Sequence, residues 1–91
     1  MGPYWFTEVV VMNIKVSNTN GVKDNNSYVR VYVNSVKVAE VSPKRRNPLG
    51  YLRQYKNSKY WGEIRVQLEC CALAGMFTLN EVDTIMNEVK G

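Results

Sequence analysis

The strongest constraint on the fold is the segment from Thr78 to Gly91, which carries the signals of an amphipathic helix. Thr78 and Glu81 have the spacing of a capping box, in which each side chain bonds the backbone N–H of the other residue. Apolar residues at helical spacing would form one stripe: Leu79, Val82, Ile85, Met86 and Val89. A helix of about three turns is marginal alone. We therefore expect this stripe to pack on a sheet.

The valine-rich segment before the middle of the chain predicts a β-hairpin. In Tyr28–Val33, three valines alternate with Tyr28, Arg30 and Tyr32, which is typical of a strand with one buried face. A second run extends from Val36 to Val41. Asn34-Ser35 between them has the length of a two-residue hairpin turn.

Two further segments show the alternation of a strand. The first is Thr7–Ser17, and the other runs from Tyr60 to about Cys70, where Ile64, Val66 and Leu68 alternate with polar residues. The sequence thus predicts an α+β fold, with an antiparallel sheet of about four strands followed by one C-terminal helix packed on one face. The expected order is β-β-β-loop-β-α.

The length of 91 residues predicts a single compact domain, residues 1–91. A long basic loop is expected at about 42–59, and Leu49, Leu52 and Tyr55 are spaced for one helical turn within it. No apolar run approaches the length of a membrane span. The N-terminal residues lack the charged start and apolar core of a signal peptide. We therefore expect no membrane contact and a cytoplasmic location, which would be the host cytoplasm for a viral protein.

Catalysis and metal binding find little support in the sequence. The chain has no histidine, so it lacks the commonest general base and the commonest metal ligand. Cys70 and Cys71 are adjacent, which disfavours a bridge between them and supplies too few ligands for zinc. Both cysteines are interpreted as small apolar residues, with an intermolecular bridge or a reactive thiol as the alternative. We expect no enzymatic activity, no cofactor and no metal.

The positive charge is concentrated in one aromatic-rich segment. Residues 44–65 contain seven lysines and arginines against one acid, Glu63. Cations neutralise phosphates, and aromatic rings stack on unpaired bases. The candidate binding residues combine these two chemistries: Lys44, Arg45, Arg46, Tyr51, Arg53, Tyr55, Lys56, Lys59, Tyr60 and Trp61, with Arg30 and Tyr32 from the second strand.

Three interpretations of this segment stay open. The tyrosines and Trp61 could cover the open face of a thin sheet, with the lysines serving only solubility. The segment could bind nucleic acid, preferably single-stranded. It could instead dock onto an acidic protein surface, as in a small phage- or virus-type inhibitor or adaptor of a host nucleic-acid-handling enzyme.

The expected order of elements resembles the arrangement of the whirly and transcriptional-coactivator families of single-stranded-DNA binders. The closest local likeness is Phe77-Thr78-Leu79-Asn80, where a strand end would lead into the C-terminal helix. Because these families act as dimers or tetramers, the resemblance implies a homo-oligomer, and we expect a dimer.

Overall fold

The computed structural model describes residues 12–20, 27–55 and 59–91. Three strands precede three helices: β1 (Ile14–Asn20), β2 (Ser27–Val33), β3 (Val36–Val41), α1 (Pro48–Gln54), α2 (Lys59–Leu73) and α3 (Leu79–Lys90). The strands form one antiparallel sheet in the order β1-β2-β3. The α+β class is confirmed, but the fourth strand and the single helix are wrong. None of the described helices has the length and apolar character needed to cross a membrane.

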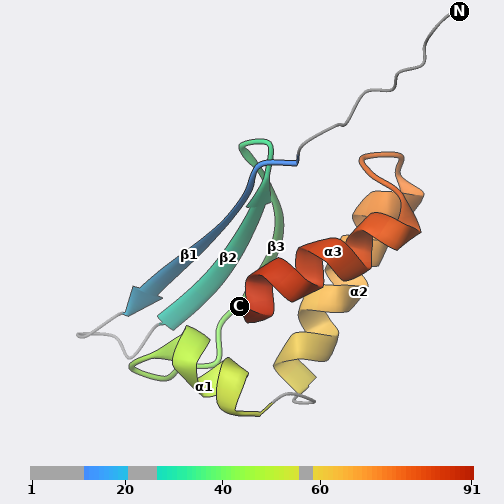
Figure 1. The fold of residues 1–91 in the computed structure, drawn as a ribbon. Helices are drawn as coiled ribbons and strands as arrows, with labels where there is room; N and C mark the ends of the chain where they lie inside the picture. The colour runs from blue at the N-terminus through green and yellow to red at the C-terminus, as the bar shows by residue number, and fades with distance from the viewer. Residues whose placement is uncertain (1–11, 21–26, 56–58) are drawn as a thin grey trace, which may run out of the picture.

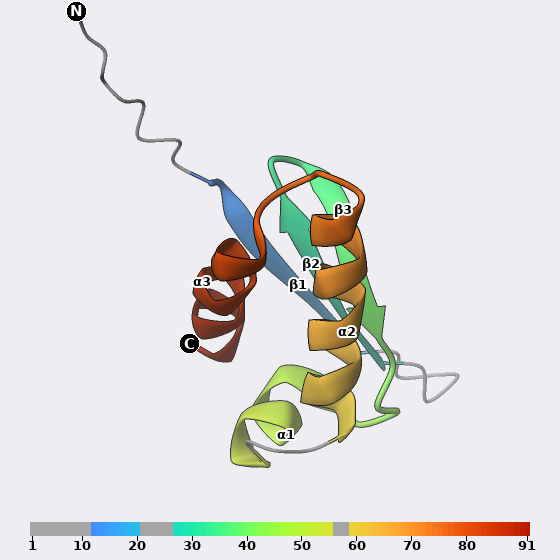
Figure 2. The ribbon, with the colours of Figure 1, turned by 90° about the vertical axis from the view of Figure 1, so that its right-hand side faces the viewer.

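Helices α2 and α3 pack on one face of the sheet, and α1 lies at one end of this layer (Figures 1 and 2). The core is built from β2 valines, from Val38, Ala39 and Val41 of β3, and from one stripe of each helix. No described element covers the opposite face of the sheet, where Tyr28, Arg30 and Tyr32 are half-buried.

The hairpin and the C-terminal helix are confirmed. Asn34 and Ser35 form the turn with φ values of 52° and 70°, and positive φ at both positions is the geometry of a type I′ turn. Thr78 and Glu81 make the reciprocal bonds of the capping box at 3.1 and 2.7 Å. The apolar stripe of α3 is buried except at Leu79, which is exposed.

The predicted fourth strand at Tyr60–Cys70 is helix α2. Ile64, Val66 and Leu68 fit a strand, but Trp61, Ile64 and Leu68 are spaced three and four apart, as on one face of a helix. The core selects the helical set: Trp61, Ile64 and Leu68 are buried, whereas Val66 is exposed. The basic loop is also shorter than predicted, because α1 occupies residues 48–54 with Pro48 in its first turn.

Other boundaries differ by a few residues. β1 extends to Asn20, beyond the predicted end at Ser17, and the predicted residues 7–11 lie outside the described part of the chain. In β3, the register with β2 shifts at Val38, which has no Cα partner there. This β-bulge lets the consecutive residues Val38 and Ala39 both be buried.

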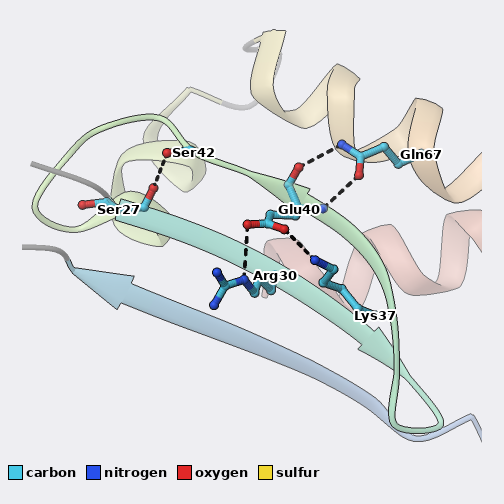
Figure 3. Close-up of polar contacts among 6 residues, drawn as sticks. All are labelled: Ser27, Arg30, Lys37, Glu40, Ser42 and Gln67. Carbon is cyan, nitrogen blue, oxygen red and sulfur yellow. Dashed lines mark hydrogen bonds and ion pairs between the residues drawn. The ribbon is translucent and has the colours of Figure 1, made fainter. Parts of the chain in front are cut away.

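Helix α2 runs beside the outer edge of β3 and caps its backbone. The Gln67 side chain accepts a hydrogen bond from the Glu40 N–H at 2.9 Å and donates one to the Glu40 carbonyl at 2.9 Å (Figure 3). One turn further along, the Cys71 thiol donates to the Val38 carbonyl at 3.6 Å. These contacts occupy backbone groups that an edge strand would otherwise offer to another chain.

The first prediction concerns this cap. Gln67→Leu should lower the free energy of unfolding by about 1–3 kcal/mol, because it leaves the Glu40 N–H and carbonyl without their partners. Chemical denaturation followed by circular dichroism measures the change. Gln54→Leu, on the exposed end of α1, is the matched control and should be near neutral. Equal stability of the Gln67→Leu variant and the unchanged protein would show that the cap contributes nothing.

Candidate nucleic-acid interface

Three tyrosine rings gather where α1 and the start of α2 meet. Tyr51 lies in the middle, with ring centroids 5.0 Å from Tyr55 and 6.1 Å from Tyr60. Asn47 caps α1 by accepting a hydrogen bond from the Gly50 N–H at 3.2 Å, which fixes the start of the helix that carries Tyr51 and has Tyr55 as its C-cap. Tyr55 is 50% exposed, so one ring of the group has a free surface.

Two cations lie over these rings. The Arg45 guanidinium lies 4.8 Å from the centroid of the Tyr51 ring, and the Lys59 ammonium lies 5.3 Å from that of Tyr60. We call this set the α1 surface. It comprises the three tyrosines and the five exposed cations Lys44, Arg45, Arg46, Arg53 and Lys59.

The cations of the α1 surface lack carboxylate partners within the described part of the chain. Each ion pair among the described residues involves Arg30, Lys37 or Arg65 instead. Arg65, inside the basic segment, binds Glu69 at 3.2 Å and Asp83 at 2.7 Å, which joins α2 to α3. The hydrogen bond and charge of Asp83, followed by Glu69, raise the pKa of Arg65. The charge of Arg65 is therefore paired within the protein, whereas the cations of the α1 surface have no carboxylate partner among the described residues.

The outer sheet face holds the two remaining candidates, Arg30 and Tyr32, and its charge is already neutralised in part. Glu40 binds Lys37 at 2.7 Å and Arg30 at 3.3 Å (Figure 3). The Arg30 guanidinium also lies 4.5 Å from the Tyr28 ring centroid. The structure thus divides the predicted residues between two surfaces, of which the α1 surface has the more available charge.

Trp61 is not a surface residue. It is 3% exposed, and its indole N–H donates to the Leu52 carbonyl, which ties α2 to α1. A ring in this position cannot stack on a base, so we remove Trp61 from the candidate interface. Its helical spacing with Ile64 and Leu68 was the sequence signal for burial. Lys56 lies outside the described residues, as do the N-terminal aromatic residues.

Metal-binding groups are absent from the part of the chain that the structure describes: no three His, Cys, Asp or Glu side chains come together there. Comparisons with protein-family models, with curated proteins and with solved structures found no match. The β-β-β-β-α order behind the resemblance to single-stranded-DNA binders is also not the observed order.

The second prediction concerns Glu40. Its pKa is lowered, chiefly by the hydrogen bond from Lys37, and also by the charges of Lys37 and Arg30. A lowered folded-state pKa stabilises the protein above the ordinary value of 4.5, and this stability is lost as the pH falls through the folded-state pKa. Glu40→Gln should thus cost up to about 1 kcal/mol at pH 7 and less at low pH. Urea unfolding at pH 7 and pH 3 measures both values, and an equal cost at the two would contradict the assignment.

Proposed function

We propose that this protein is a non-enzymatic module that binds single-stranded nucleic acid through the α1 surface. The observation that carries the proposal is the set of five exposed cations without carboxylate partners among the described residues, two of which, Arg45 and Lys59, lie over rings of the three clustered tyrosines. Cations of this kind neutralise phosphates, and the exposed ring of Tyr55 offers a stacking surface for an unpaired base.

Single strands fit this surface better than a duplex for a geometric reason. The bases of a duplex are stacked on each other, so their faces are closed to a protein ring, whereas an unpaired base presents its face. Exposed Tyr55 follows the seven-residue helix α1, and the half-buried ring of Tyr51 lies between the rings of Tyr55 and half-buried Tyr60. A short stacking platform bordered by cations can follow a few nucleotides of one strand.

The third prediction tests the charges. Changing Lys44, Arg45 and Arg46 together to Ala should weaken binding to a fluorescent single-stranded oligonucleotide. The slope of log affinity against log salt should become shallower by about 2, at about 0.7 per phosphate contact on single strands. Fluorescence anisotropy at several salt concentrations gives both quantities. The matched control changes Lys15, Lys37 and Lys90 to Ala, which removes equal charge elsewhere and should change the slope less.

The fourth prediction tests stacking. Tyr55→Ala should weaken single-strand binding about 5- to 150-fold, corresponding to 1–3 kcal/mol for one stacked base, while leaving the salt slope nearly unchanged. Tyr32→Ala, on the outer sheet face, is the control and should have a smaller effect. If Tyr32→Ala were the more damaging change, the interface would belong on the sheet.

A second candidate, docking onto an acidic protein surface as an inhibitor or adaptor, uses the same cations. It differs in what the tyrosines contact, because a folded protein offers no row of unpaired bases. Absence of oligonucleotide binding at low salt would defeat the nucleic-acid proposal and leave this candidate. A partner captured from nuclease-treated lysate, and lost on changing Lys44, Arg45 and Arg46, would then support it.

A further inference from the structure

Helix α2 is apolar on two sides, and only one of them faces the core. Trp61, Ile64 and Leu68 face inward. The opposite side carries a row spaced four, four and three residues apart, which places it on one face of the helix. We call this row the outer stripe: Gly62, Val66, Cys70 and Leu73.

The outer stripe is exposed along its whole length. Val66 is 58% exposed and Leu73 is 79% exposed, and Gly62 and Cys70 are also exposed. In Figure 2, α2 stands in front of the sheet with α3 to one side. Met76 and Leu79, beyond the end of α2, are exposed as well.

Gly62 has no packing role that the described residues explain. A Cβ placed on it meets no atom within 4 Å, and its φ is not in the left-handed region. Glycine inside a helix costs about 1 kcal/mol relative to alanine. Because Gly62 weakens the helix and meets no described neighbour, we infer that its missing side chain allows the close approach of a second helix.

We propose that the protein forms a symmetric dimer through the outer stripe, with α2 of a second copy packed antiparallel on it. In an antiparallel pair centred beside Leu68, Gly62 lies next to the partner's Leu73, and Val66 lies opposite the partner's Cys70. At each end of the interface, the smallest residue of the stripe, Gly62, therefore packs against the largest, the partner's Leu73. This is the self-complementarity that a twofold interface requires.

A parallel pair would lack this match. It would place Gly62 on the partner's Gly62 and Leu73 on the partner's Leu73, leaving a gap at one end and crowding at the other. Charge does not oppose the antiparallel pair at the stripe itself, because its four residues are uncharged. Two acids flank the stripe: Glu69 is bound by Arg65 at 3.2 Å, and exposed Glu63 lies beside Gly62, at the end that would meet the partner's uncharged Leu73.

The fifth prediction measures the dimer directly by sedimentation equilibrium, without nucleic acid. The unchanged protein should dimerise with a dissociation constant between about 1 µM and 1 mM, as expected of a small interface. Leu73→Glu should weaken the dimer at least about tenfold, because each copy would bury a carboxylate. Val36→Glu makes the same chemical change at an exposed position on β3 and should leave the constant unchanged.

The Gly62→Ala variant distinguishes a change in dimerisation from a change in the stability of the monomer. In dilute protein, where the monomer prevails, the substitution should raise the unfolding midpoint by about 4–8 °C through helix propensity. The same variant should dimerise more weakly, because the added methyl group meets the partner's Leu73. A stabilised variant with unchanged dimerisation would overturn the antiparallel packing.

Crosslinking gives the last readout. A short bismaleimide should join two chains of the unchanged protein and of Cys71→Ser, but not of Cys70→Ser, because Cys70 lies within the stripe and the half-buried Cys71 points to Val38. Monomeric behaviour throughout the concentration range, or crosslinking that depends on Cys71 alone, would overturn the proposal. These assays contain no oligonucleotide, so their outcome is independent of nucleic-acid binding.

Discussion

The two hydrogen bonds between the Gln67 amide and the backbone of Glu40 fasten α2 to the outer edge of β3, and the other surfaces depend on this position of α2. A three-stranded sheet has two open edges and two faces, and a single helix cannot close them all. By lying along β3, α2 covers one edge and turns Trp61, Ile64 and Leu68 into the core. The same orientation sends Val66 and Leu73 outward and brings Tyr60 to the tyrosines of α1.

Some elements of the fold are determined by neighbouring residues, whereas others depend on contacts between distant segments. The capping box of α3 and the Asn34-Ser35 turn are decided by neighbouring residues, so the sequence alone located them. The apolar residues of the segment 60–70 fit both the two-residue period of a strand and the 3.6-residue period of a helix. The packing of Trp61, Ile64 and Leu68 against the sheet selects the helix. The predicted strand, residues 60–70, was itself about eleven residues long, which exceeds the usual length of about 3–10 residues for a strand and was the unused signal.

The candidate interface was predicted in its chemistry but not in its geometry. Charge counting located the cations of residues 44–59, yet it could not show that Arg65 is bound by Glu69 and Asp83 while those of the α1 surface have no such partners among the described residues. Nor could it separate Trp61, which the fold buries, from Tyr55, which it exposes. Burial and ion pairing arise between segments distant in sequence, so composition does not reveal them.

We propose that the α1 surface, and not the sheet face, contacts single-stranded nucleic acid. The most direct test is a titration of ¹⁵N-labelled protein with a short single-stranded oligonucleotide, followed by amide chemical shifts. We expect the largest changes on residues 44–55 and 59–60. Changes concentrated on β1 and β2 around Arg30 and Tyr32, with residues 44–55 unaffected, would contradict it.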